Sequence, residues 1–212
     1  MTRSLDVLVV ENRNGAADAA VRTLEAAGHR VHRCHSPGDR GFPCRGVADP
    51  EGCPIDGHID VAVLVRRKVT PRPTPLEDGV SCALRAGVPI VEDGPAALDP
   101  FEPWIADRVR PDGDVVVACA LAADRAFDPL REKVRSKIAP LLVAAGIDPA
   151  LVGCDVDPTA LALRVHLDLP VAVDTGLEQA LGVRVLDAVR ASGRTYGQVH
   201  VQVHHLGRAS AP

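Results

Sequence analysis

Aromatic residues are almost missing from this 212-residue chain: three Phe, one Tyr and one Trp make up 2% of it. Proteins that bind nucleic acid without sequence preference stack bases on aromatic rings and hold phosphates with clustered Lys and Arg. This chain has neither feature, because its formal net charge is −4 and it contains no block of basic residues. We therefore expect no nucleic-acid partner.

Long apolar runs are also missing, since none reaches the roughly 20 residues that a membrane-spanning helix needs. The amino terminus leads almost directly into a strand pattern, without the charged and apolar segments of a secretory leader. We expect a cytoplasmic protein without a membrane partner. Thiols stay reduced in the cytoplasm, so the six cysteines favour a metal site or catalysis over disulfides.

Phosphate-binding glycine motifs are a third absence. No Gly-x-Gly-x-x-Gly follows the first strand pattern, and no Gly-rich loop ends in Gly-Lys-Ser/Thr. What the chain does have is 46% hydrophobic residues, dominated by Ala, Val and Leu, which is enough for a packed core. Its length suits two domains of about 100 residues each.

The first half alternates strand and helix patterns. Nearly continuous apolar runs predict strands buried on both faces, a weaker run predicts an edge strand, and apolar residues at helical spacing predict two helices. The strands are expected over 5–10, 29–34, 59–65 and 88–92, and the helices over 16–27 and 76–86. This alternation predicts a parallel sheet with right-handed crossovers.

The runs L-D-V-L-V-V-E, D-V-A-V-L-V and G-V-P-I-V, in this order, resemble a flavodoxin-like or degenerate response-regulator receiver-like domain over residues 4–95. The receiver resemblance implies acidic residues after the first strand and a phosphoacceptor aspartate at the end of the third. Here Glu11 stands alone, and Arg66 and Arg67 follow the third strand. We therefore assign no phosphorylation site, and a flavin held at the strand ends stays open.

The second half predicts a different module. We expect a linker over 99–111, in which Phe101 and Trp104 pack between domains, and then the strand-helix-strand-strand-helix-strand order of a ferredoxin-like α+β domain. The elements are expected over 114–121, 129–145, 151–155, 160–169, 175–192 and 198–204. The predicted domains are thus a flavodoxin-like domain over 1–98 and a ferredoxin-like domain over 112–206.

The carboxyl-terminal helix and the run Y-G-Q-V-H-V-Q-V-H resemble the alkaline-shock protein family and the cytoplasmic domains of cation-efflux proteins. That resemblance implies an interaction or dimerisation module. We therefore expect a homodimer formed through the second domain.

The main chemical signal is a Cys-rich loop over 34–58. Eight residues separate Cys34-His35 from Cys44, and eight more separate Cys44 from Cys53. Thiolates are soft ligands that suit zinc and iron–sulfur clusters, and the Gly residues between them expose amide groups of the kind that surround such clusters. We predict that this loop holds an iron–sulfur cluster or a zinc ion, although its spacing matches no common zinc knuckle or ferredoxin run.

Three thiolates leave a fourth position, with three candidates. Cys82 lies early in the second helix, which begins at the carboxyl edge of the sheet; His58 can reach back from five residues past Cys53; His35 adjoins Cys34, whose side chain should point the opposite way. The alternatives are free surface thiols, a Cys82 that is only a small buried side chain, and a catalytic thiol with a histidine base. No nucleophile signature surrounds these cysteines, so we assign no catalytic residue.

The remaining cysteines and histidines have simpler interpretations. Cys119 and Cys154 lie in strand patterns and are expected in the core. His200 and His204 alternate with Val on the solvent side of the last strand, and His205 follows. Solvated side chains explain these three histidines, and the alternatives are a weak metal site or a pH-sensitive interface.

The sequence thus favours a non-enzymatic sensor, regulatory or scaffold protein that binds a metal or an iron–sulfur cluster. Two other classes stay open. One is a redox enzyme or electron-transfer protein that uses the cluster or a flavin. The other is a protein-interaction module without metal.

Overall fold

The computed structural model describes residues 3–38, 40–42, 44–70, 72–95, 100–159, 162–193 and 196–205. The chain divides into two compact units, residues 1–126 and 127–212. Each unit has its own sheet, and each is described by itself.

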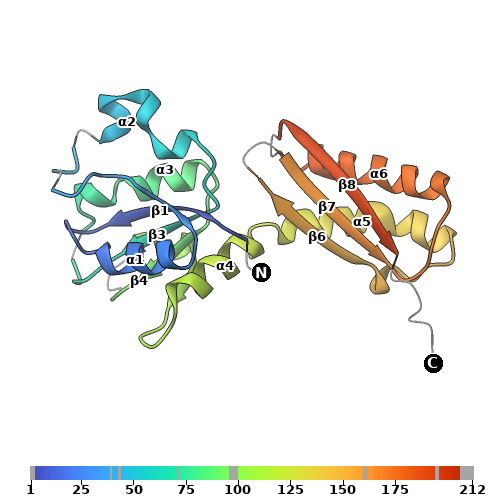
Figure 1. Ribbon diagram of the computed structural model, residues 1–212, viewed down its shortest axis with the longest axis horizontal. Helices are drawn as coiled ribbons and strands as arrows, with labels where there is room; N and C mark the ends of the chain where they lie inside the picture. Colours follow the sequence, from blue (N-terminus) through green and yellow to red (C-terminus); the bar gives the residue numbers. More distant parts are fainter. Residues whose placement is uncertain are drawn as a thin grey trace. The chain divides into compact units, whose positions relative to one another are not determined.

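The first unit contains a five-stranded parallel sheet in the order β2-β1-β3-β4-β5 (Figure 1). Its strands are β1 (Asp6–Glu11), β2 (Arg30–Arg33), β3 (Val61–Val65), β4 (Ile90–Asp93) and β5 (Ile105–Val109). This is the doubly wound strand order of flavodoxin-like folds. The α/β class and the small flavodoxin-like parallel sheet predicted from the sequence are confirmed.

Helices cover both faces of this sheet. Helices α1 (Asp18–Ala26) and α4 (Val115–Arg125) pack on one face, over Val7, Val9 and Val63. Helix α3 (Gly79–Arg85) packs on the other face, against Leu8 and Leu64. Because β1 and β3 are covered on both sides, every residue of these two strands is buried.

The connection from β2 to β3 is the irregular part of this unit. Where the fold would use a crossover helix, the chain forms the one-turn helix α2 (Arg45–Ala48) and two 3₁₀ turns, η1 (Pro50–Gly52) and η2 (Pro54–Asp56). We call residues 34–60 the cysteine crossover. It contains three of the six cysteines.

Two sequence predictions are corrected here. The supposed linker over 99–111 contains the 3₁₀ turn η4 (Glu102–Trp104) and then β5, which pairs with β4 as the edge strand. The supposed strand over 114–121 belongs to α4. Its Val run favoured a strand, but the Asp114 carboxylate accepts a hydrogen bond from Val116 N and caps a helix.

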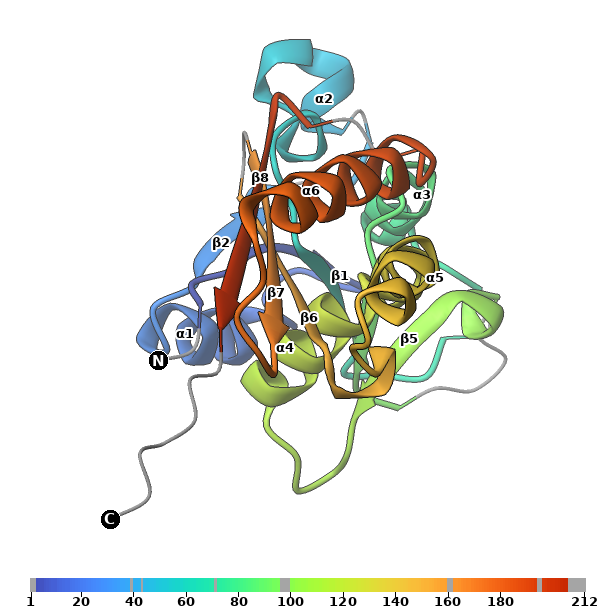
Figure 2. The same ribbon diagram turned by 90° about the vertical axis from the view of Figure 1, so that its right-hand side faces the viewer.

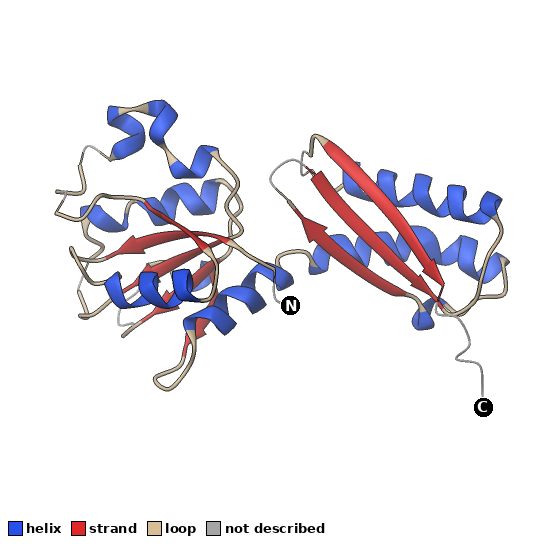
Figure 3. Cartoon of the chain, viewed as in Figure 1, coloured by secondary structure: helices blue, strands red, loops and turns tan. Residues whose placement is uncertain are grey.

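The second unit is an α+β layer with the order helix, two strands, helix, strand (Figures 2 and 3). Its elements are α5 (Asp128–Ala144), the 3₁₀ turn η5 (Pro149–Leu151), β6 (Gly153–Pro158), β7 (Ala162–Leu169), α6 (Thr175–Arg190) and β8 (Gln198–His205). Strand β7 is central, antiparallel to β6 and parallel to β8. Leu163, Val165 and Leu167 alternate with less buried residues along β7, as in a sheet covered on one face.

The predicted βαββαβ order of the second domain is therefore wrong by one strand. Its expected first strand is α4, which packs on the first unit, so the second unit begins at Phe127 rather than at residue 112. The other five predicted elements occur in their predicted order. Within the described part of the chain, no helix is long and apolar enough to cross a membrane.

Candidate metal centre

Four cysteines line one small cavity on the α3 side of the first sheet. The cavity has a volume of about 40 Å³ and is bordered by Cys34, Cys44, Cys53 and Cys82, together with Leu8, Gly46, Pro54, Ile55, Asp78 and Gly79. These cysteines are far apart in the sequence, and the fold brings them together. The structure thus gathers the three crossover thiols and the predicted helical thiol at one place.

Separate elements position the four thiols. Cys34 follows the last residue of β2, and its amide donates a hydrogen bond to Val9 O, which extends the pairing with β1 by one residue. Cys44 precedes α2, and Cys53 precedes η2. Cys82 lies in the first turn of α3 and accepts a hydrogen bond from Arg85 Nη2 at 3.2 Å. The site is therefore a crossover held against a helix.

We expected this site at the carboxyl edge of the sheet. The cavity does border Asp78 and Gly79, where α3 begins, but it also borders Leu8 in the middle of β1. It therefore extends over the face of the sheet beneath the cysteine crossover. A crossover without a long helix leaves that space for the thiols.

Two glycines make room for the sulfur atoms. A Cβ built on Gly79 would come within 2.7 Å of Cys34 Sγ, and one built on Gly46 would come within 2.9 Å of Cys53 Sγ. Neither glycine has a positive φ. Glycine is therefore required at these positions because a side chain would collide with a sulfur atom, and not because of the backbone conformation. A larger residue at either position would displace a thiol.

The electrostatic surroundings of Cys34 disfavour its ionised form. Burial, followed by the neighbouring Cys82, Cys44, Cys53 and Asp78, raises the pKa of the Cys34 thiol to about 12. A nucleophilic cysteine needs a lowered pKa, so this environment disfavours catalysis by Cys34. A bound cation supplies the charge that lets such a thiol ionise and coordinate.

The spacing of the sulfurs bears on the kind of centre. Tetrahedral zinc at a Zn–S distance of about 2.3 Å holds its sulfurs about 3.8 Å apart. Among the described residues, no three cysteine sulfurs lie within 4.8 Å of one another. An iron–sulfur cluster places iron and sulfide between its cysteines, so its cysteine sulfurs lie farther apart than those of a zinc site.

The two histidines proposed as ligands lie elsewhere. His35 is buried, but it does not border the cavity, and its Nε2 has no hydrogen-bond partner among the described residues. His58 precedes β3 at the amino edge of the sheet, where its Nε2 lies 3.0 Å from Asp60 Oδ1. The cysteines therefore form the cavity without either histidine.

His58 belongs to a second cluster, at the amino edge of the sheet. Oxygen and nitrogen atoms of Asp6, His58 and Asp60 lie within 4.8 Å of one another, close enough to hold a metal ion. Basic groups already occupy these carboxylates: Asp60 pairs with Arg3, and Asp6 pairs with Arg30 and His32. The Asp6 amide also donates to Asp60 Oδ2. The cluster therefore balances its charge without a metal.

Within this cluster, His58 and Asp60 shift each other's pKa. The hydrogen bond to Asp60 raises the pKa of His58, against the effect of burial. Burial alone would raise the pKa of Asp60, but hydrogen bonds from His58 and the Asp6 amide, and the charge of Arg3, outweigh it and lower that pKa. The pair is thus an ion pair at mildly acidic pH, and it holds the end of the cysteine crossover against β1.

Sequence reasoning missed a buried ion network near the carboxyl edge. Arg66, directly after β3, lies 2.7 Å from Glu77 and 2.9 Å from Glu92, and Arg108 on β5 lies 2.8 Å from Glu92. Glu77 also accepts a hydrogen bond from the amide of Thr74 at the start of η3 (Pro75–Glu77), the turn that leads into α3. The network fixes the start of the helix that carries Cys82.

This network also fills the place where a receiver has its phosphoacceptor. The side chain of Arg66 is 5% exposed, and those of Glu77 and Glu92 are fully buried. The sequence signal was limited to single charged residues beside apolar runs, which says nothing about how they pair.

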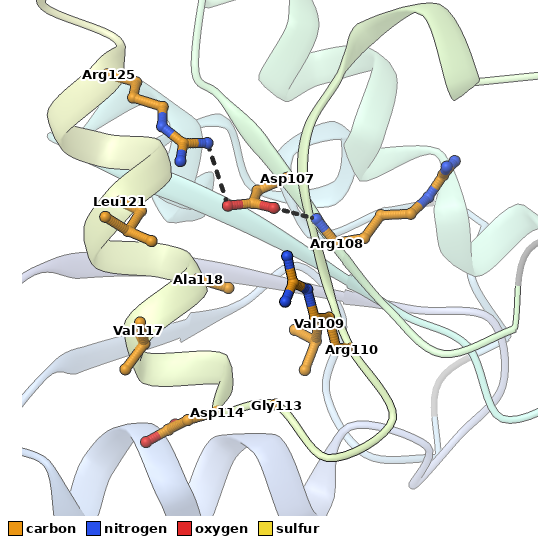
Figure 4. A pocket seen from close by; sticks show the side chains of 10 residues that line it. All are labelled: Asp107, Arg108, Val109, Arg110, Gly113, Asp114, Val117, Ala118, Leu121 and Arg125. Atoms are coloured by element: carbon orange, nitrogen blue, oxygen red, sulfur yellow. Dashed lines mark hydrogen bonds and ion pairs between the residues drawn. The ribbon is translucent and has the colours of Figure 1, made fainter.

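A larger, open hollow of about 410 Å³ lies between β5 and α4 (Figure 4). Arg108 and Arg110 of the β5 side and Arg125 of α4 border it, and Asp107 pairs with Arg125 at 3.4 Å. Val117 and Leu121 project from α4 along its other side. The described residues that border the hollow offer no thiol or imidazole to a metal ion.

The other cysteines are buried as predicted, but one of them lies on a different element. Cys119 and Cys154 are buried, and burial raises the pKa of both thiols, that of Cys119 to about 12. Cys119 lies on α4 rather than on a strand. His200 and His204 are exposed on β8, and His205 Nε2 lies 2.9 Å from Glu178. All six cysteines are free thiols.

Comparisons with known proteins add little to this geometry. No family model matches the chain, and no curated protein matches it. The chain is similar to a solved structure described as "Low Resolution Structure of Response Regulator StyR", at 14% identity over 90% of this chain and 89% of that chain, with a TM-score of 0.34. The fold class of the first unit therefore rests on its strand order.

Proposed function

We propose that the chain is a metal-dependent sensor or regulatory protein whose centre is an iron–sulfur cluster bound by Cys34, Cys44, Cys53 and Cys82. The observation that carries this proposal is the convergence of four thiols, three from the cysteine crossover and one from α3, on one cavity. Single buried cysteines are common core residues. Four that share a cavity, with two glycines shaped around their sulfurs, are not explained by packing.

A cluster is favoured over zinc because of the sulfur spacing described above. It would supply redox and oxygen sensitivity, because its potential depends on the thiolates, on hydrogen bonds to sulfur and on solvent access. In this chain Arg85 donates a hydrogen bond to Cys82, and Leu8 and Ile55 restrict access of water. Zinc held by the same four residues is the alternative centre.

The site explains how a signal could arise. In its described residues the crossover forms one-turn elements, and we expect its order to depend on what binds its cysteines. Gain or loss of the centre would therefore order or release residues 34–60. A partner that recognises one of these states would read the signal.

Two rival functions lose support from the same features. Pockets for drug-sized ligands have volumes of about 300–1,000 Å³, so the cysteine cavity of about 40 Å³ is too small for a flavin, and a flavin at the strand ends stays an alternative. A thiol catalyst needs an ionised cysteine and a nearby base, whereas the Cys34 pKa is raised and neither His35 nor His58 borders the cavity.

Self-association through the second unit is part of this proposal. Strand β8 is eight residues long and forms one edge of its sheet, and long edge strands pair readily with other chains. Sedimentation of the full chain should show a dimer. A monomer at all concentrations would remove this part of the proposal and leave the metal centre untouched.

The metal proposal is tested by four single substitutions, Cys34→Ser, Cys44→Ser, Cys53→Ser and Cys82→Ser, with Cys119→Ser as the matched control. Protein reconstituted anaerobically with iron and sulfide should show the broad visible absorption of an iron–sulfur chromophore. Each of the four variants should lose at least about tenfold in cluster occupancy, and the control should keep it. Colourless protein that binds zinc at the same residues would replace the cluster with zinc. Equal retention in all five variants would overturn the site.

A further inference from the structure

The open face of the second sheet carries an arrangement that the cysteine site does not use. Helices α5 and α6 cover one face of the β6-β7-β8 sheet, and the strands present their other face in Figure 3. Along β7, His166 and Asp168 alternate with the buried Val165, Leu167 and Leu169, so both polar side chains lie on the open face. His204 of β8 lies on the same face, in register with Asp168.

The two histidines are in direct contact. His166 Nδ1 lies 3.1 Å from His204 Nε2, the ring planes differ by 12°, and the ring centroids are 5.4 Å apart. That centroid separation is close to the N···N distance plus two ring radii, so the rings meet edge to edge with their nitrogens facing each other. Because a neutral imidazole donates from one nitrogen and accepts at the other, two neutral rings can form one hydrogen bond here.

This nitrogen separation suits a metal ion. Two nitrogens bound to tetrahedral zinc at about 2.0–2.1 Å lie about 3.3 Å apart, and square-planar coordination brings them slightly closer. The nitrogen separation needs to change by only a few tenths of an ångström, but each ring must rotate by about 35–45° to aim its lone pair at one ion. For both nitrogens to bind, whichever of the two neutral rings donates must move its proton to its own other nitrogen, so binding needs no other reactant.

Asp168 is the candidate third donor: its oxygens and the two histidine nitrogens do not all lie within 4.8 Å of one another, so its side chain must rotate to reach the ion. Among the described residues, no hydrogen bond or ion pair engages its carboxylate, whereas Asp155 and Asp157 on β6 pair with Arg131 and Arg164. A Cβ built on Gly153 would come within 3.0 Å of Asp168 Oδ2, so this carboxylate now lies over the glycine of β6. Rotation of the side chain brings it back toward His204, its register neighbour.

We propose that His166, Asp168 and His204 form a second metal site, an open two-histidine, one-carboxylate site for a divalent transition ion such as zinc, nickel, cobalt or ferrous iron. Imidazole and carboxylate donors select this class over magnesium and calcium, which prefer all-oxygen ligands. The three donors leave coordination positions open to solvent. This site is independent of the cysteine centre, because its donors come from a different sheet.

Cobalt(II) distinguishes the two sites in one sample of the full chain. Thiolate ligation produces a sulfur-to-cobalt charge-transfer band in the near ultraviolet, whereas nitrogen and oxygen ligands give only weak visible bands. We expect a fraction of the cobalt to bind without the charge-transfer band. His166→Ala and His204→Ala should each weaken this fraction at least about tenfold, and Asp168→Asn should weaken it by about tenfold.

The matched control is His200→Ala, which removes an exposed histidine from the same face of the same strand, where its register neighbour is Arg164. Its cobalt affinity should stay within about twofold of the parent chain, because the donor set is intact. Circular dichroism of every variant should be unchanged, since these side chains lie on the open face. No nitrogen-type cobalt spectrum, or equal losses in His200→Ala and His204→Ala, would overturn the second site. Loss of the thiolate band alone would count only against the cysteine centre.

Discussion

The two connections that lead into and out of β2 are built in opposite ways. Helix α1, which precedes β2, buries Ala20, Val21 and Leu24 against the sheet. The cysteine crossover, which follows it, leaves Phe42 72% exposed and Val47 65% exposed. The helical connection is thus stabilised by apolar burial, whereas the second connection has thiols where a crossover helix would have an apolar stripe. We infer that metal ligation by the cysteines, rather than burial of apolar side chains, stabilises the cysteine crossover.

The largest change in the free energy of unfolding should come from a substitution in α1, the helical connection. Leu24 is fully buried in the α1 cluster, so Leu24→Ala should lower the free energy of unfolding of the first unit by about 2–5 kcal/mol. Urea denaturation measures this loss, which should be the same with and without metal. A loss that appears only in the metal-free protein would contradict the division between the two connections.

The next effect should come from metal removal. A ligand present at a hundredfold excess over its dissociation constant stabilises the state that binds it by about 2.7 kcal/mol. Chelation should therefore speed amide hydrogen exchange within residues 34–60 and leave α1 unchanged. Uniform faster exchange over the whole first unit would show that the centre supports the fold rather than the crossover.

A smaller effect should follow from Gly79→Ala. Its new Cβ would lie 2.7 Å from Cys34 Sγ, so the thiol must move, and overpacking of this kind costs about 1–3 kcal/mol. Metal occupancy should fall with stability. Gly182→Ala is the control, because nothing lies within 4 Å of its built Cβ on α6. That substitution should stabilise the second unit by about 0.5–1 kcal/mol without touching the metal.

The smallest effect should come from His58→Ala and should depend on pH. The raised His58 pKa contributes stability that is full below its unfolded value of 6.5 and is lost as pH rises through the folded value. The lowered Asp60 pKa contributes stability above 3.8 that is lost as pH falls through the folded value. The variant should therefore lose about 1 kcal/mol near pH 5.5 and less near pH 8.5. Equal losses at both pH values would contradict the ion pair.

Much of the fold follows from local sequence patterns. The continuous apolar runs of β1 and β3 and the helical spacing of α1 predict their elements, because burial on both faces or along one stripe leaves a clear period. The wrong predictions occur where the same residues match both the strand period and the helix period. In 114–121 the Val residues favour a strand, but Val115, Ala118, Cys119 and Ala122 also mark a helical face. The Asp114 cap and packing on the sheet decide in favour of the helix.

The candidate site could also be predicted in part from the sequence. Residue type marked the crossover cysteines, and topology placed Cys82 near them. The glycines beside the sulfurs, the Arg66 network and the contact of His166 with His204 depend on distances between segments far apart in the chain. No period or motif encodes such distances, so the sequence alone could not reveal them.

The most direct test of the central claim is the amount of iron, sulfide and zinc bound per chain after anaerobic purification. We predict iron and acid-labile sulfide in equal amounts, with Cys34, Cys44, Cys53 and Cys82 protected from thiol reagents in the folded protein. A chain that carries no metal, and whose four cavity thiols react freely while folded, would contradict the account.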